Sequence, residues 1–241
     1  MIFNIDDKKS KSLFLSGIKI NASWAAFLTN EIIDELKSIE NKLAEISNSD
    51  FTSITPDAAK VLRFLSVPVD KIKIVVLGQD PYPQAGVATG RAFEVGNLKS
   101  WSETYRNPSL KNIIRAIYKA YSGKIKTYKM IKEELGQAFK ILPPAKAFQS
   151  WEKQGVLFLN TAFTCTIDAS NSHSKIWQSF SSRLFSFIDE HAPDAIWFIW
   201  GNNAQEISSG LKLKNTIFSY HPSRCNPREK DFLYGNVNCF A

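Results

Sequence analysis

The stretch IVVLGQDPYPQAGVATGRAF, Ile74–Phe93, begins as an apolar run and breaks off into a turn. The run IVVL does not alternate between apolar and polar residues, which is typical of a strand buried on both faces. The turn holds one carboxylate, Asp80, followed by Pro81 and Tyr82. Because Asp before Pro commonly initiates a turn, Asp80 by itself indicates only local structure. The rest of the chain decides whether this carboxylate has a chemical role.

Three other short apolar runs share this pattern, and helical patterns separate them. Together with the first run they predict four strands, at Ile72–Leu77, Val156–Leu159, Ala195–Trp200 and Thr216–Tyr220. Continuous apolar strands that alternate with helices are typical of a parallel sheet covered by helices on both faces. The sequence therefore predicts an α/β fold.

Helical periodicity extends over five segments of the chain. The expected helices are Ser23–Ile46, Pro56–Leu65, Asn107–Tyr121, Ser174–His191 and Asn203–Lys212. Thr55 and Ser109 are the expected N-caps of the second and third helices. Because no internal repeat or low-complexity linker interrupts these elements, we expect a single domain over residues 1–241, with an N-terminal helical segment at about 21–66.

The composition limits the class of protein. The 241 residues contain 30 Lys and Arg against 23 Asp and Glu, a formal charge of +7 that suits a polyanionic partner without demanding one. Three cysteines, Cys165, Cys225 and Cys239, form no CxxC pair, which argues against a disulfide framework or a zinc knuckle. The N-terminal MIFNIDDKKSKS lacks a signal-peptide core, and no apolar run is long enough to cross a bilayer. We expect a soluble protein in a reducing, intracellular compartment.

Polar residues follow each predicted strand. They are Gly78–Tyr82, Asn160–Thr161, Gly201–Asn203 and His221–Ser223. Since parallel strands end at the same edge of a sheet, all four clusters are expected to meet there, where open α/β sheets bind ligands. The two remaining histidines, His173 and His191, are expected to be structural or surface residues.

These segments, in their order along the chain, resemble the family 1 uracil-DNA glycosylases. GQDPYPQAGVATGRAFEV resembles the family's GQDPYH catalytic loop and the strand that follows it. The other matching segments are NPSLKNI, WEKQGVLFLNTAFTC, SNSHSKIWQSF, WFIWGNNAQ and YHPS. The resemblance extends from about Ile72 to Phe240. It implies a single-domain, three-layer α/β/α fold around a four-stranded, twisted parallel sheet.

The resemblance also implies a reaction: hydrolysis of the N-glycosidic bond of a flipped deoxyuridine in base excision repair, without cofactor or metal. Asp80 is then the carboxylate that stabilises the oxocarbenium-like sugar and orients the attacking water. His221 is expected to donate a hydrogen bond to uracil O2, assisted by the backbone N–H of Gln79. One carboxylate suffices because the leaving uracil anion is stabilised rather than protonated.

The resemblance implies that three further side chains select the base. Asn160 would bind the N3 and O4 edge of uracil, a pattern that cytosine does not match. Tyr82 would occupy the space beside C5 and exclude the methyl group of thymine. Phe93 would stack on the base.

The resemblance further implies loops that contact DNA phosphates. The residues of this chain at the matching positions are Pro108, Ser109, Gly201, Asn202, Pro222, Ser223, Arg224 and Cys225. The expected partners are uracil-containing DNA, single-stranded or double-stranded, and a protein inhibitor that mimics DNA. We expect a monomer that makes no contact with membranes, and we expect its affinity for DNA to depend on salt.

Three positions depart from the family pattern. Pro83 replaces the His of GQDPYH, as in the poxvirus branch of the family. In the wedge loop, Cys225 aligns by count with the usual Leu and Arg224 lies beside it, so either residue could fill the gap left by a flipped base. Glu94 replaces the Ser of AFSV, and its charge would oppose DNA binding unless it points away.

Two other functions compete with uracil excision. One is a DNA-binding replication accessory protein on the same fold, with reduced or no catalysis, a role that the poxvirus branch also serves. The other is a glycosylase for a different base, which Tyr82, Asn160 and His221 argue against. The chain lacks the HxE and PCxxC spacing of a zinc deaminase and the Gly-Lys-Ser/Thr loop of a nucleotide hydrolase.

Overall fold

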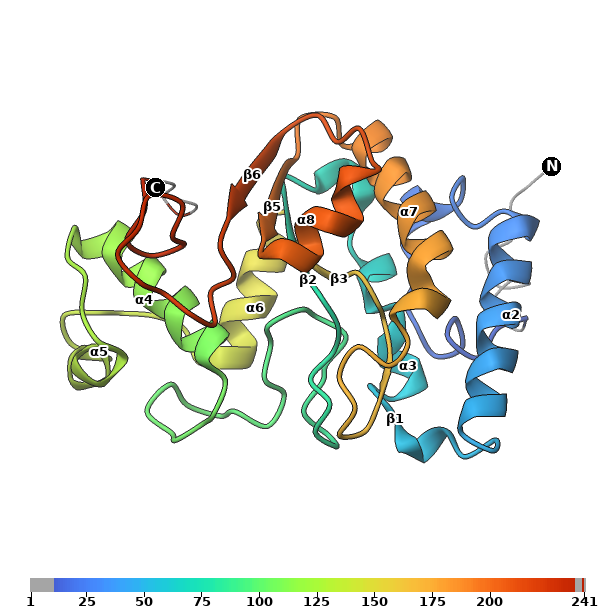
Figure 1. Cartoon of the computed structure of the whole chain (residues 1–241), viewed down its shortest axis with the longest axis horizontal. Coiled ribbons are helices and arrows are strands. Elements are labelled where there is room, and N and C mark those ends of the chain that lie inside the picture. Colours follow the sequence, from blue (N-terminus) through green and yellow to red (C-terminus); the bar gives the residue numbers. More distant parts are fainter. Residues whose placement is uncertain (1–10, 237–239, 241) are drawn as a thin grey trace.

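A central sheet of four parallel strands organises the protein, as the computed structural model shows for residues 11–236 and 240 (Figure 1). Its strands are β2 (Ile74–Gly78), β3 (Val156–Asn160), β5 (Ile196–Trp200) and β6 (Thr216–Ser219), in the spatial order β3-β2-β5-β6. Val76 pairs with Phe158 on one side and with Phe198 on the other, which fixes the register. The four predicted parallel strands are confirmed.

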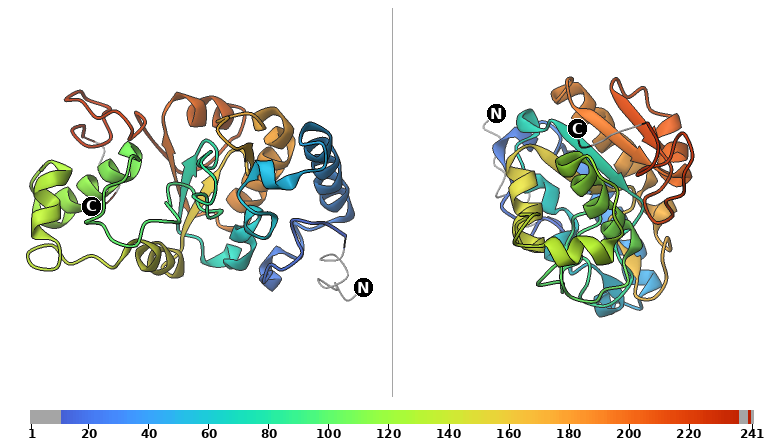
Figure 2. Two further views of the ribbon diagram at one scale, coloured as in Figure 1. Left: turned by 90° about the horizontal axis from the view of Figure 1, so that it is seen from below. Right: turned by 90° about the vertical axis from the view of Figure 1, so that its left-hand side faces the viewer.

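Helices cover both faces of the sheet (Figures 1 and 2). On one face, alternate residues such as Val75 and Leu77 share a core with α7 (Ser174–His191) and with α2 (Asn30–Ile46), which packs against α7. On the other face, Val76 and Phe158 share a core with α4 (Pro108–Ser122) and α6 (Pro144–Lys153). The other α-helices among the described residues are α3 (Ala58–Val61), α5 (Tyr128–Glu134) and α8 (Asn202–Ser209). The predicted three-layer α/β/α fold is confirmed.

The expected helix Ser23–Ile46 is wrong in its first part. A 3₁₀ turn, Ala22–Trp24, comes first, and α2 begins only at Asn30, where the Thr29 hydroxyl accepts the Ile32 N–H at 3.3 Å. Trp24 is fully buried and its indole N–H donates to the Val67 carbonyl at 2.7 Å. The chain turns because this indole must reach a partner 43 residues away, which helical periodicity does not reveal.

The two predicted N-caps are also wrong. Thr55 belongs to a two-stranded antiparallel sheet, in which β1 (Ile54–Thr55) pairs with β4 (Cys165–Thr166). The helix expected after it is reduced to α3 and a 3₁₀ turn, Arg63–Ser66. Ser109 lies in the first turn of α4, whose N-cap residue is Asn107. The small sheet and helices α5 and α6 were not expected from the sequence.

The segment after β6 runs from the edge of the sheet toward α4 and lies beside this helix (Figures 1 and 2). Lys119 on α4 donates to the Leu233 carbonyl at 2.9 Å, and Arg115 donates to the Tyr234 hydroxyl at 2.9 Å. These contacts fasten residues 233 and 234 of this segment to α4. Among the described residues, no helix is long and apolar enough to cross a membrane.

Candidate active site

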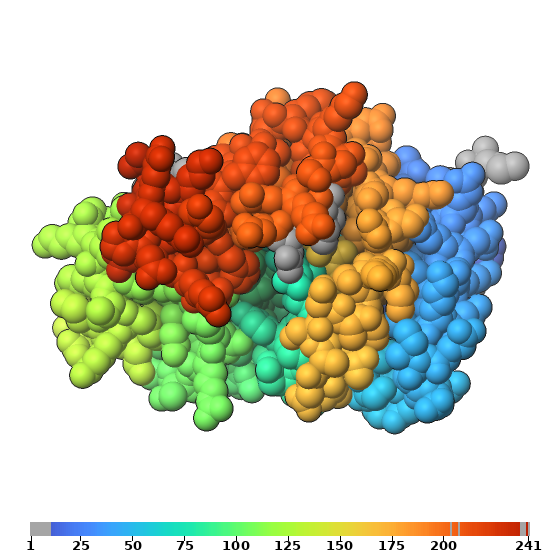
Figure 3. Space-filling view, viewed as in Figure 1, coloured from blue at the N-terminus to red at the C-terminus, as the bar shows by residue number. Residues whose placement is uncertain are grey.

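The polar clusters at the strand ends meet around a pocket of about 220 Å³. It is lined by all six residues predicted to act on the base, namely Gln79, Asp80, Tyr82, Phe93, Asn160 and His221. In the space-filling view, this face is hollowed between the segment after β6 and the loop after β2 (Figure 3). The structure therefore brings together residues that lie up to 142 positions apart, as the convergence of parallel strand ends predicts.

Asp80 is half-buried and is held by one backbone hydrogen bond. Its Oδ2 accepts the Asn171 N–H at 2.5 Å. Burial raises the pKa of Asp80, and the hydrogen bond from Asn171 only partly opposes this effect. Sequence reasoning missed Asn171, although it lies in the matching segment SNSHSKIWQSF, because a backbone N–H leaves no side-chain signal.

A buried thiol lies next to this carboxylate. Cys165 donates to the Pro81 carbonyl at 3.5 Å, which fixes the residue that follows Asp80. Burial first, and the charge of Asp80 second, raise the pKa of Cys165 to about 12, so the thiol stays protonated at neutral pH.

His221 is held in one tautomer. Its Nδ1 accepts the Ser223 N–H at 3.2 Å and lies 2.8 Å from the Ser223 hydroxyl. Because the backbone N–H can only donate, Nδ1 is an acceptor and the neutral ring carries its proton on Nε2. Burial lowers the pKa of His221, which favours this neutral form. The imidazole therefore presents one N–H donor, at Nε2.

Gly201 makes room for this histidine. A Cβ at Gly201 would lie 2.8 Å from the His221 Cβ, and the residue has φ +91°. The predicted phosphate-contacting glycine thus has a packing role against the imidazole.

The peptide group between Gly78 and Gln79 is held by a hydrogen bond to its carbonyl oxygen. The Gly78 carbonyl accepts the Thr161 N–H at 3.0 Å. In a planar trans peptide the N–H points opposite to the carbonyl, so the Gln79 N–H points away from Thr161. The Gln79 carbonyl is held in turn by the Thr161 hydroxyl at 2.7 Å and the Ala162 N–H at 3.0 Å.

Asn160 is buried at the end of β3, where it pairs with Gly78 across the sheet. A Cβ at Gly78 would lie 2.5 Å from the Asn160 Oδ1 and 2.9 Å from the Ala92 Cβ. Glycine at this position therefore leaves the space that the Asn160 amide needs.

Tyr82 and Phe93 form an aromatic part of the wall. The Tyr82 hydroxyl donates to the Phe93 carbonyl at 3.4 Å, and burial raises the pKa of the phenol, which therefore stays protonated. The Phe93 ring lies 5.5 Å from the Trp200 ring and 6.3 Å from the His221 ring, centroid to centroid. Phe93 has φ +64°, a backbone conformation that residues other than glycine rarely adopt.

Four of the eight predicted DNA-contact residues line a second hollow, a groove of about 630 Å³ that shares Gln79 and His221 with the pocket. Gly201, Asn202, Ser223 and Arg224 line this groove, whereas Ser109 lines the pocket itself. Pro108 and Ser109 lie in the first turn of α4. From the same helix, the Asn112 amide donates to the Pro222 carbonyl at 2.6 Å and so ties α4 to the loop of His221.

Arg224 and Cys225 have different surroundings. Arg224 is exposed in the groove. Cys225 is half-buried and packs against the core on the α4 side of the sheet, and its thiol donates to the Pro222 carbonyl at 3.6 Å. Burial and the charge of Asp231 raise the pKa of Cys225 to about 11. The third cysteine, Cys239, lies outside the described residues.

The structure shows the surroundings of three other residues that the sequence singled out. Glu94 is buried, bound by Arg91 and Thr89, so its charge is not presented to solvent. His173 is buried between the hydroxyls of two threonines, at 3.0 and 3.1 Å, and is a structural residue. His191 is exposed at the last position of α7, where its ring stacks on Phe187.

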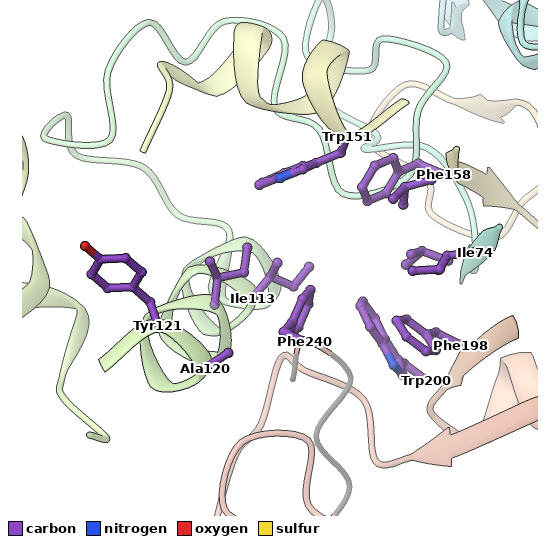
Figure 4. A pocket seen from close by; sticks show the side chains of 12 residues that line it. Ile74, Ile113, Ala120, Tyr121, Trp151, Phe158, Phe198, Trp200 and Phe240 are labelled. Atoms are coloured by element: carbon purple, nitrogen blue, oxygen red, sulfur yellow. The ribbon is translucent and has the colours of Figure 1, made fainter. Parts of the chain in front are cut away.

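A larger cavity, of about 370 Å³, lies between the sheet, α4 and α6 (Figure 4). Its walls are apolar and include Trp151, Phe158, Trp200 and Phe240. None of the described residues that line it carries a carboxylate, an imidazole or an amine. It lacks the carboxylate and the imidazole that the expected reaction requires, whereas the smaller polar pocket holds both and is therefore the candidate active site.

Comparison with known proteins identifies the family. The model of the uracil DNA glycosylase superfamily matches residues 66–236. The uracil-DNA glycosylase of Fusobacterium nucleatum is 34% identical over 188 residues, 78% of this chain and 74% of the relative. That of a Pseudomonas fluorescens strain is 31% identical over 210 residues, 86% of this chain and 82% of the relative.

Solved structures show the same fold. The mimivirus UNG Y322F, crystallised in complex with UGI, superposes with a TM-score of 0.66 at 25% identity, covering 84% of this chain and 70% of that one. UNG from Nitratifractor salsuginis gives a TM-score of 0.69 at 22% identity, covering 91% and 90%. The fold, the pocket and the sequence relationships agree, and the chain belongs to the uracil DNA glycosylase superfamily.

Proposed function

We infer that this protein is a monofunctional uracil-DNA glycosylase, which hydrolyses the bond between a flipped uracil and its deoxyribose and leaves an abasic site. The observation that carries this inference is one pocket of about 220 Å³ lined by a half-buried carboxylate and a neutral imidazole. These two groups match the two charges that form when the bond breaks, positive on the sugar and negative on uracil. A non-catalytic accessory role is not favoured, because all six groups expected to act on the base meet in this pocket.

Asp80 is suited to stabilise the sugar cation. Burial makes its negative charge unfavourable in the free protein, as the direction of its pKa shift indicates. A positive charge that develops on the sugar compensates this penalty, so the interaction is stronger in the transition state than in the ground state. We expect the same carboxylate to orient the water that attacks the sugar.

His221 and Gln79 are suited to stabilise the departing base. The Nε2–H of a neutral imidazole donates a hydrogen bond without transferring a proton, and this bond strengthens as negative charge collects on uracil O2. The free N–H of Gln79 would add a second donor. No general acid is then needed.

The pocket wall sets the choice of base. We propose that the Asn160 amide reads the N3 and O4 edge of uracil, that Tyr82 blocks the C5 methyl of thymine, and that Phe93 stacks on the ring. All three side chains are held by packing or hydrogen bonds before substrate arrives, which reduces the ordering cost of binding.

For the gap left by the flipped base, we propose Arg224. It is exposed in the groove beside His221, whereas Cys225 packs inward. A guanidinium can fill the gap by stacking on the neighbouring bases. Pro108, Ser109, Gly201, Asn202, Pro222 and Ser223 are proposed to contact the DNA strand.

Three finer expectations belong to this proposal. A monomer is expected to act on uracil-containing DNA in a reducing, intracellular compartment. A DNA-mimicking protein inhibitor is expected to bind over the groove; the mimivirus relative has been crystallised with UGI. The whole chain is expected to act as one domain.

The test is release of free uracil from a labelled oligonucleotide that contains one uracil, single-stranded or paired with G or A. Asp80→Asn, which keeps the shape and removes the charge, is the control. Release by the wild type alone supports the proposal. Retained DNA binding without release would refute it and point to the accessory role.

A further inference from the structure

Arg91 lies in the wall of the pocket, and its side chain is only 4% exposed. Its Nε donates to the Glu152 Oε1 at 2.9 Å, and its Nη2 binds the other oxygen of the same carboxylate. Its Nη1 donates to the Glu94 Oε2 at 3.0 Å, and Thr89 donates to that same oxygen at 2.6 Å. The guanidinium fork thus holds two carboxylates at once, which lysine cannot do with the same geometry.

The charges of this network balance once Arg63 is included. Arg63 is half-buried and interacts electrostatically with Arg91, Glu94 and Glu152, giving two positive and two negative groups. Burial alone would lower the pKa of Arg91, but the hydrogen bonds and charges of Glu152 and Glu94 outweigh it and raise the pKa. Removing one carboxylate would leave a buried guanidinium without its full compensation, which is the costly way to break a buried ion pair.

The network brackets the residue expected to stack on the base. Arg91 and Glu94 lie on either side of Phe93 in the sequence, and Glu152 anchors them to α6. Phe93 has a positive φ, so the backbone around it does not adopt this conformation by local preference. Contacts on both sides must hold it there, and the network supplies them.

We propose that Arg91, Glu94 and Glu152 are positioning residues of the base pocket, which hold Phe93 where its ring covers the flipped base. This inference rests on the proposed function of the pocket. The network would act on the affinity for the base and on the rate of bond cleavage. It would not act on the affinity for DNA without uracil, since none of its groups lines the DNA groove.

The most informative variant is Glu152→Gln. Glu152 is on α6 and does not line the pocket, and the change keeps its shape while removing its charge. We expect the single-turnover excision rate to fall, and the inhibition constant of free uracil to rise, each by roughly 10- to 100-fold, since a misplacement of about 1 Å can cost on the order of 100-fold. The dissociation constant for uracil-free DNA should not change.

The matched control is Glu134→Gln. Glu134 on α5 also pairs with a cation, Lys126, and its side chain is 24% exposed against 16% for Glu152. This control should leave the excision rate and both affinities at the wild-type values. Arg91→Lys, which keeps the charge and loses the fork, should fall between Glu152→Gln and the wild type.

Wild-type excision and wild-type uracil inhibition in Glu152→Gln, with only a lower melting temperature, would overturn the inference and leave the network a structural one. If Glu152→Gln does not fold, Arg91→Lys carries the test, and wild-type uracil inhibition in that variant overturns the inference equally. A wild-type protein that releases no uracil would instead overturn the proposed function itself.

Discussion

We expect Gly201→Ala to lower uracil excision by about 100-fold while leaving the fold intact. The added Cβ would lie 2.8 Å from the Cβ of His221. Since carbon atoms in contact are normally about 3.5–4.0 Å apart, the imidazole must retreat by roughly 1 Å. A displacement of about 1 Å in a catalytic group costs on the order of 100-fold in rate.

The same variant has a separate cost in stability. Gly201 has φ +91° and ψ 163°, a region that is used almost only by glycine. Alanine there is strained by about 1–3 kcal/mol. For a protein of this size, each kcal/mol lowers Tm by about 2–4 °C.

Gly123→Ala separates strain from displacement. Gly123 has φ +69° after α4, and a Cβ there meets no atom within 4 Å. This control should lose about 1 kcal/mol of stability and no activity. Both variants are compared by single-turnover excision and thermal unfolding. An unchanged rate in Gly201→Ala would refute the role given to the position of His221.

The other predictions concern charge, base choice and the wedge. Asp80→Asn and His221→Ala should each lower kcat by about 100- to 10,000-fold at unchanged fold, measured by single-turnover excision and circular dichroism; near-normal rates in both would contradict the mechanism. Activity requires ionised Asp80 and neutral His221. Because the pKa of His221 is lowered below 6.5, protonation of the imidazole should reduce kcat/KM only below pH 6.5, and because the pKa of Asp80 is raised above 3.8, protonation of the carboxylate should reduce kcat/KM already above pH 3.8. A kcat/KM that stays constant down to pH 3.8 would contradict the direction given for Asp80. Tyr82→Ala should release thymine from a T-containing oligonucleotide, and continued strict rejection would show that another group guards C5. Arg224→Ala should impair excision from duplex DNA more than from single strands, whereas Cys225→Ala should not; a decrease of about 0.9 in the salt slope of binding would instead mark Arg224 as a phosphate contact.

The arrangement of the sheet and the convergence of its polar ends were predictable from the sequence. Uninterrupted apolar runs indicate buried parallel strands, and parallel strands collect their following residues at one edge. Asp80, Asn160 and His221 each lie at the end of a strand or within two residues of it, so their meeting in one pocket required no knowledge of loop conformation.

The elements that the sequence did not predict depend on contacts between distant residues. The break between Trp24 and α2 exists because the indole reaches the Val67 carbonyl, and helical periodicity cannot encode that contact. The network of Arg91 joins residues 61 positions apart, and Glu94 alone suggested only an unfavourable charge. Likewise, the inward packing of Cys225 follows from the segment after β6 lying beside α4, which no local pattern predicts.

The hydrogen bond from Asn112 to the Pro222 carbonyl couples the N-terminal part of α4 to the loop of His221. The first turn of α4 and the loop of His221 are both proposed to touch the DNA strand, and this bond links them across 110 positions. If bound DNA displaces the first turn of α4, this bond transmits the displacement to the loop of His221, and the reverse also holds. Contact with DNA and the position of the imidazole are therefore coupled. An engineer who wishes to exchange the wedge loop should keep residues 221–223 and begin the replacement at Arg224, where the chain is no longer tied to α4 by this bond.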